Sequence, residues 1–157
     1  MENQLTILAE SLEKKIQVLT EIQEYNKRQE QIFSADNVDM LAFDDTVEEK
    51  GRLIEKLALL DEGFETLYEK LSEQLKDNRQ KYALEIRGIQ QQIAQITEMS
   101  VVIQAQEKRN KQLVEQYFIR ERKEIRQKRQ VSKAAYDYYK KVNNTSFVQP
   151  QFVDSKQ

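Results

Sequence analysis

The chain has 157 residues, enough for one domain, and 33% of them are charged while only three are Gly and one is Pro. So few turn-forming residues exclude a sandwich or barrel with many tight turns, and long helices remain. The chain contains no His and no Cys, which excludes a histidine base, a cysteine nucleophile, a zinc knuckle and disulfides. We therefore expect an all-α protein that is not an enzyme and holds no cofactor or metal.

Hydropathy and charge indicate where the protein resides. No apolar run approaches the roughly 18 residues of a membrane span, and the start, MENQLTILAE, lacks the basic region of a secretory signal. The net charge is only −2, so bulk charge indicates no class of partner. We expect a cytoplasmic protein without a membrane partner.

The first predicted element is a helix over about residues 3–32. Its apolar residues recur at steps of three and four, which keeps one face apolar. Beyond Ile22 the pattern weakens, because Tyr25 and Asn26 stand where aliphatic residues are expected. The predicted core residues of this helix are Leu5, Leu8, Leu12, Ile16, Leu19, Ile22 and Phe33.

A second helix follows a break at residues 33–37. Asp36, with Asp39 three residues later, has the form of a helix N-cap. The later part of the apolar pattern has the regular steps of a coiled-coil seam. Gly51 and Gly63 each cost about 1 kcal/mol relative to Ala, or mark a kink or a close helix approach, and the sequence leaves this open. The predicted seam is Val38, Leu41, Val47, Ile54, Leu57, Leu60, Phe64, Leu67, Leu71 and Leu75.

Residues 76–78 form the least apolar junction and predict the turn into a third helix over residues 79–130. At about 1.5 Å per residue that helix is ~78 Å long, against ~45 Å for the first, so its end lacks a partner of equal length. We expect an antiparallel bundle of three long helices in residues 1–131 and a C-terminal helical arm and flexible tail in 132–157. The predicted seam of the third helix is Tyr82, Ile86, Ile89, Ile93, Ile96, Val102, Ile103, Leu113 and Tyr117.

Charge is distributed unevenly along the chain. Residues 118–141 contain nine basic and three acidic side chains, whereas residues 30–73 contain thirteen acidic and four basic ones. The basic segment could pair with the acidic second helix, keep an overhanging helix soluble, or contact acidic surfaces of a partner. Nucleic acid is disfavoured, because Glu121 and Glu124 interrupt the stripe and the pI is near 5.5. The candidate basic contacts are Arg120, Arg122, Arg126 and Arg129.

An acidic group in the second helix is a candidate cation site. Asp44, Asp45, Glu48 and Glu49 place carboxylates at i and i+4, which could hold a hard cation. A carboxylate di-iron bundle needs Glu-x-x-His pairs, and this chain has no His. We interpret the group as a solvated helix face and expect no metal.

Two apolar features indicate partner binding. Residues 93–103 include six aliphatic or thioether side chains, a width that fits contact with two helices or a groove for an amphipathic helix. Five of the thirteen aromatic residues follow residue 135, and they could complete the core or form an arm over a groove. The candidate partner-binding residues are Met99, Val102, Ile103, Tyr117, Ile119, Tyr136 and Tyr139.

Three segments resemble flagellar type III export chaperones of the FlgN/FliT kind, the FlgN type above all. Residues 48–61, EEKGRLIEKLALLD, are similar to the second-helix pattern of that family, and residues 103–113, IQAQEKRNKQL, to its third helix. Ala135 and Tyr136 match a late Ala-Tyr element, although the Gly that usually follows is absent. The plan of three long helices with a basic C-terminal arm also matches.

The resemblance implies a chaperone that binds late export substrates before secretion, either hook–filament junction proteins or the filament cap protein. It implies that the chaperone covers the terminal helices of these clients and delivers them to the export apparatus, a further partner. The alternative is a structural or adaptor coiled-coil protein that self-associates and has no flagellar client. The sequence leaves open which client binds and whether the chain is a monomer or a homodimer.

Overall fold

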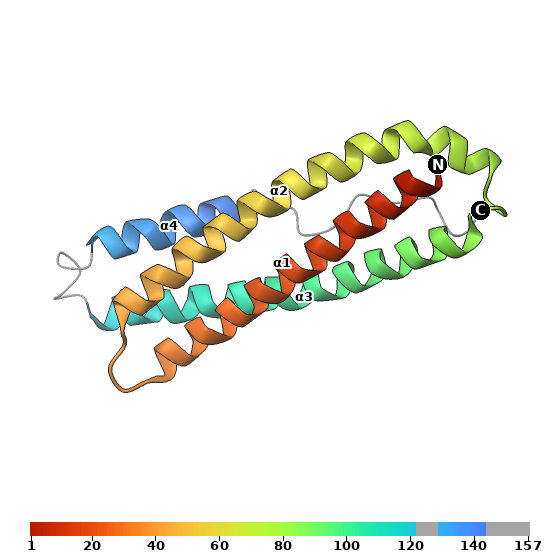
Figure 1. Ribbon diagram of the computed structural model, residues 1–157. Coiled ribbons are helices and arrows are strands. Elements are labelled where there is room, and N and C mark those ends of the chain that lie inside the picture. The colour runs from red at the N-terminus through yellow and green to blue at the C-terminus, as the bar shows by residue number, and fades with distance from the viewer. Residues whose placement is uncertain (122–128, 144–157) are drawn as a thin grey trace.

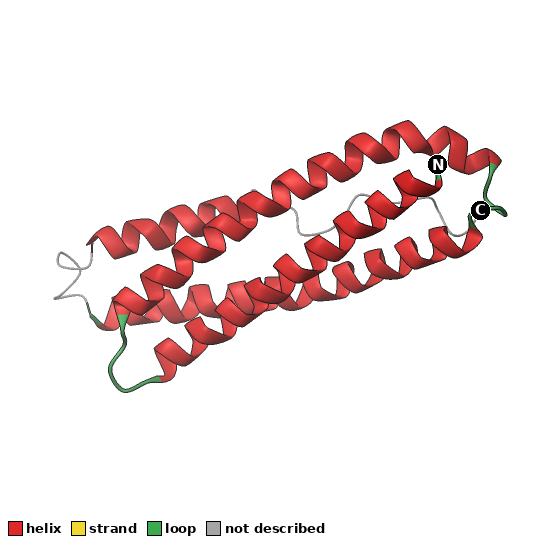
Figure 2. Cartoon of the chain, viewed as in Figure 1, coloured by secondary structure: helices red, strands yellow, loops and turns green. Residues whose placement is uncertain are grey.

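The computed structural model describes the backbone of residues 1–121 and 129–143 and the side chains of residues 1–121 and 133–142. Three long antiparallel helices are followed by a short one, and the described residues include no strand (Figures 1 and 2). The all-α bundle prediction is confirmed. No helix in these ranges has the length and apolarity needed to cross a bilayer. The helices are α1 (Glu2–Ser34), α2 (Met40–Asp77), α3 (Ala83–Arg120) and α4 (Arg129–Asn143).

The helices are arranged so that one half of the molecule has four and the other half three. α1 packs along both α2 and α3, while α4 packs on α2. Figure 1 shows α4 beside the first half of α2, near the last part of α3. The four-helix half therefore contains the α1–α2 loop and the end of α3.

The core of α1 forms as the periodicity predicts. All seven predicted residues, from Leu5 to Phe33, are buried, and Leu8, Leu19 and Ile22 are fully buried. Steps of three and four keep these side chains on one face, which α2 and α3 cover together. Burying such an aliphatic side chain contributes about 1.5–3 kcal/mol.

The start of α2 differs from the prediction. The N-cap is Asp39, whose carboxylate accepts a 3.0 Å hydrogen bond from the Ala42 amide, and it is not Asp36. Leu41 is therefore not in the seam: it is 76% exposed, whereas Phe43 is fully buried and packs edge-on against Phe33 at 5.1 Å. Leu41 lies two positions from Phe43, which is about 200° around the helix, so the two side chains face different sides.

α2 continues through both of its internal glycines. A Cβ added at Gly63 would meet no atom within 4 Å, and one at Gly51 would meet only the Lys141 ammonium, at 3.8 Å. A close helix approach therefore requires neither glycine. The predicted turn after α2 is confirmed, because α2 ends at Asp77 and the Asn78 amide donates to the Leu75 carbonyl.

The third helix is shorter than predicted. α3 ends at Arg120 and not at residue 130, with Glu121 as its C-cap, and α4 begins at Arg129. The end of α3 does have packing partners, because Tyr117 lies edge-on to Phe33 at 5.7 Å. Folding back removes the apolar residues of α4 from water, which a single overhanging helix could not do. The buried residues of α4 are Ala135, Tyr138, Tyr139 and Val142.

The broad apolar face of α3 is only partly covered. Ile96 and Ile103 are fully buried, but Val101 is 62% exposed and Val102 is 47% exposed. The prediction that Val102 belongs to the core seam is therefore wrong. The helix presents its buried face to α1, and two adjacent valines lie about 100° apart and cannot both face one neighbour. The predicted flexible tail after residue 143 lies outside the described residues.

Candidate functional site

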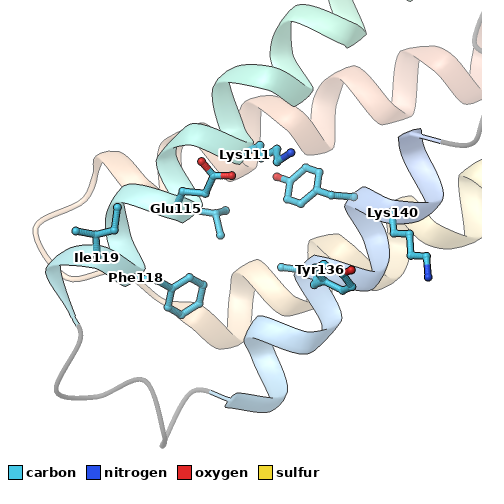
Figure 3. Close-up of a pocket in the computed structure, with 9 residues that line it drawn as sticks. Lys111, Glu115, Phe118, Ile119, Tyr136 and Lys140 are labelled. Carbon is cyan, nitrogen blue, oxygen red and sulfur yellow. The ribbon is translucent and has the colours of Figure 1, made fainter.

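A pocket of about 680 Å³ opens between the last turns of α3 and the facing side of α4 (Figure 3). We call it the α3–α4 pocket. It brings together three of the predicted partner-binding residues: Ile119 from α3, and Tyr136 and Tyr139 from α4. Its lining consists of Lys111, Val114, Glu115, Phe118, Ile119, Ala135, Tyr136, Tyr139 and Lys140.

The walls of the α3–α4 pocket are mainly apolar and partly open to solvent. Ile119 is 61% exposed and Tyr136 is 68% exposed, which is unusual for side chains of this size. Phe118 projects from α3 toward α4 (Figure 3). Large exposed apolar side chains beside a concave surface are typical of a site that binds another apolar surface.

Tyr139 places a buried polar atom in this pocket. The side chain is only 9% exposed, and its hydroxyl has no hydrogen-bond partner among the described residues. Burial, together with the charges of Glu107 and Glu115, raises the pKa of Tyr139. The hydroxyl therefore stays protonated and can donate a hydrogen bond to a ligand.

The rim of the α3–α4 pocket is charged. Lys111 and Glu115 lie one turn apart on α3, and Lys140 extends from α4 (Figure 3). None of the three forms an ion pair with any other residue in the described part of the chain. Two lysines against one glutamate leave the rim with a positive charge.

The other predicted partner-binding residues lie elsewhere. Ile103 and Tyr117 are buried in the core, so neither presents a free surface in this fold. Met99 is half-buried against the core, and Val102 is exposed but outside the α3–α4 pocket. The sequence predicted that all seven residues contribute to one groove. Only the last three of them along the chain, Ile119, Tyr136 and Tyr139, lie together at a pocket.

The basic segment is described in part. Arg120 is exposed in the last turn of α3. Lys141 pairs with Glu55 of α2 at 3.2 Å, which agrees with the interpretation that basic residues near the C-terminus face the acidic second helix. The side chains of Arg122, Arg126 and Arg129 lie outside the described residues.

A second feature of the four-helix half is a buried polar cluster, here called the Lys50 cluster. Its members come from all four helices, and each is at most 6% exposed. Sequence reasoning missed the cluster, because Lys and Glu are expected on solvated faces. The cluster consists of Asn26 and Gln29 of α1, Thr46 and Lys50 of α2, Glu107 and Asn110 of α3, and Tyr138 of α4.

Lys50 and Glu107 form the centre of the cluster. The Lys50 ammonium lies 2.7 Å from the Glu107 carboxylate, donates to the Gln29 side-chain oxygen at 3.0 Å, and lies 4.2 Å from the centre of the Tyr138 ring. Tyr138 in turn donates to Glu107 at 2.7 Å. Charge buried in a protein must be paired in this way, since an unpaired ion would lose its hydration without compensation.

The surrounding amides complete the Lys50 cluster. Asn110 donates to the Asn26 carbonyl at 3.0 Å and to the Gln29 side-chain oxygen at 3.2 Å. Gln29 donates to the Thr46 hydroxyl at 2.9 Å. The polar contacts of the Lys50 cluster therefore link the four helices into one network, which needs one particular register.

Burial shifts the pKa values of the central groups. Loss of water lowers the pKa of Lys50 to about 8, although the neighbouring Glu107 acts in the opposite direction. Burial and the charge of Glu107 raise the pKa of Tyr138 well above its ordinary value. At neutral pH the cluster thus contains a protonated lysine and a neutral tyrosine around one carboxylate.

One sequence signal could have revealed the cluster. Asn26 and Gln29 continue the α1 seam four and seven residues after Ile22, and Lys50 precedes Leu57 by one heptad. Polar residues at seam positions are typical of buried networks that specify register.

Comparisons with known proteins provide no further guide. No protein-family model, no curated protein and no solved structure matches the chain.

Proposed function

We propose that this protein is an export chaperone that binds a helical segment of a late flagellar substrate through the α3–α4 pocket. The clients are hook–filament junction proteins or the filament cap protein, which the chaperone delivers in the cytoplasm for type III secretion. The observation that carries the proposal is an apolar pocket with exposed Ile119 and Tyr136 on its walls. The resemblance of residues 48–61 and 103–113 to export chaperones supplies the client class.

The physical basis is the addition of one more helix to a bundle. An amphipathic client helix would place its apolar side chains against Phe118, Ile119 and Tyr136. Buried apolar surface contributes about 25 cal/mol per Å², less the cost of ordering the client. The basic residues that follow Ile119 would then contact acidic surfaces of the client or of the export apparatus.

Isothermal titration of the full chain tests this proposal. The titrants are the C-terminal helical segments of the source organism's own junction and cap proteins. We expect saturable one-to-one binding, which Ile119→Glu and Tyr136→Glu weaken because each places a charge on a pocket wall. Leu84→Glu is the matched control, since Leu84 is 75% exposed and outside this pocket. Equal binding by all three variants, or none by the natural chain, would contradict the proposal.

Exposed Val101 and Val102 favour a second candidate function, that of a self-associating structural or adaptor coiled coil. In that case α3 would pair with α3 of a second copy along these valines. A dimer would melt at a temperature that rises with protein concentration. Light scattering that shows a dimer separated by Val102→Glu, together with no heat from any flagellar client, would establish this alternative.

A further inference from the structure

The α3–α4 pocket combines an apolar interior, one buried hydroxyl and a positive rim, and this combination restricts the chemistry of its occupant. We propose that the pocket recognises an acidic amphipathic helix that also carries a neutral polar side chain, such as Gln, beside its apolar anchor. The inference deepens the proposed function, because it assumes that a partner helix enters this pocket, and it adds which residues that helix must present.

The apolar interior selects the anchor of the helix. Val114 and Ala135 line the pocket from opposite helices and are 6% and 3% exposed. Phe118 projects from α3 toward α4 (Figure 3). A pocket with walls of this kind excludes a charged side chain, which would lose its hydration without a partner. A leucine or phenylalanine from the incoming helix instead gains contacts on both sides.

The rim selects the charge on the flanks of the helix. Lys111 belongs to α3 and Lys140 extends from α4, so the two helices of the pocket each supply one lysine (Figure 3). Neither lysine has an ion-pair partner in the described ranges. Among the described residues that line the pocket, only Glu115 opposes them. Glu or Asp on the flanks of a bound helix would pair with these lysines, whereas Lys or Arg would be repelled.

The Tyr139 hydroxyl selects a neutral acceptor. It is buried in the pocket without a hydrogen-bond partner among the described residues. A ligand that accepts a hydrogen bond from this hydroxyl therefore binds more tightly than one that leaves it unpaired. Glu107 and Glu115 both lie close enough to raise the pKa of this tyrosine. A second carboxylate at the same point would meet their negative charge, and an amide oxygen would not.

The test uses fluorescence anisotropy with the full chain and three designed helical peptides of ~20 residues, long enough to form helix on binding. The first peptide carries a Leu anchor, a Gln one turn away and Glu on both flanks. The second replaces that Gln with Leu, and the third replaces the flanking Glu with Lys. We expect the first peptide to bind most tightly, and added salt to weaken its binding because the flank pairs are exposed.

Two variants assign the contacts. Tyr139→Phe removes only the unpaired hydroxyl, so the fold is kept, and we expect binding of the Gln peptide to weaken about fivefold while the Leu peptide is unaffected. The double variant Lys111→Gln with Lys140→Gln is expected to weaken binding of the Glu-flanked peptides about threefold. Glu-flanked and Lys-flanked peptides should then bind this variant with equal affinity. Lys14→Gln with Lys70→Gln is the matched control, since both lysines are exposed on α1 and α2 away from the pocket.

Several outcomes would overturn the inference. It fails if the three peptides bind equally, if none binds, or if neither variant changes their order. It also fails if scattering shows a dimer that Tyr136→Glu separates, because a second copy would then be the occupant. Natural client helices that bind without any response to Tyr139→Phe or to the lysine pair would overturn this inference and leave the chaperone function standing. If the designed peptides bind in the expected order but no flagellar client binds, this inference stands and the proposed chaperone function is overturned.

Discussion

The Tyr138 hydroxyl donates a 2.7 Å hydrogen bond to the Glu107 carboxylate, and this contact joins α4 to α3 inside the protein. Glu107 is at the same time the ion-pair partner of Lys50 of α2. The short last helix is therefore part of the core, and three helices converge on one carboxylate. A C-terminal truncation that removes α4 would leave the Lys50–Glu107 pair exposed on one side, so point variants are the better probes of function.

Tyr138→Phe tests how strongly the hydroxyl stabilises the fold. We expect the free energy of unfolding to fall by about 1.5–3 kcal/mol, because the Glu107 carboxylate loses a buried hydrogen bond. Urea denaturation followed by circular dichroism measures the change. Tyr136→Phe is the control and should leave the stability unchanged, since Tyr136 is 68% exposed.

Lys50→Met tests the buried ion pair. The single substitution leaves Glu107 charged and buried without its cation, so we expect a loss of about 3–5 kcal/mol. The double variant Lys50→Met with Glu107→Leu removes both charges, and its stability should return to near that of the natural chain. A double variant less stable than Lys50→Met alone would show that the pair stabilises the fold more than apolar packing does.

The stability of the protein is expected to depend on pH in the alkaline range. Between about pH 8 and 10.5 the unfolded chain keeps the Lys50 proton while the folded chain releases it, so stability rises with pH over this window. Above about pH 10 the unfolded chain loses the Tyr138 proton and the folded chain keeps it, so stability falls. Urea denaturation at a series of pH values measures both slopes, and Lys50→Met should abolish the rise.

The start of α2 offers a test of the fold itself. Phe43→Ala removes a fully buried ring that packs on Phe33, and we expect a loss of about 3–5 kcal/mol. Leu41→Ala, two positions earlier, should change the stability by less than about 0.5 kcal/mol, because Leu41 is 76% exposed. The opposite order in denaturation experiments would mean that Leu41, as predicted from the sequence, and not Phe43 lies on the buried face at the start of α2.

Much of the fold follows from local pattern. The seven core residues of α1 and the turn after Asp77 were predicted correctly, because a helix of fixed pitch with regular apolar steps has only one face to bury. The error at Leu41 has a local cause too. Leu41 follows Val38 at a step of three, but it lies six residues before Val47, about 240° around the helix, whereas the buried Phe43 lies four residues before Val47.

The candidate site follows from the sequence only in part. Ile119, Tyr136 and Tyr139 were predicted as partner contacts, and the α3–α4 pocket brings them together. Ile103 and Tyr117, predicted with them, are buried in the core instead. Both residues lie on the apolar face of α3, as their spacing predicts. The apolar character of a face does not by itself distinguish a core face from a binding face.

The class of the fold, the number of long helices and the whole buried face of α1 follow from the sequence, because they depend on the pitch of a helix and on the residues within a few turns. Three features become clear only in the folded chain: α3 ends at Arg120, α4 returns to the bundle, and Lys50 is buried against Glu107 and Tyr138. Whether a buried charge is stable depends on the partners that other helices supply. The spacing along one helix does not contain that information.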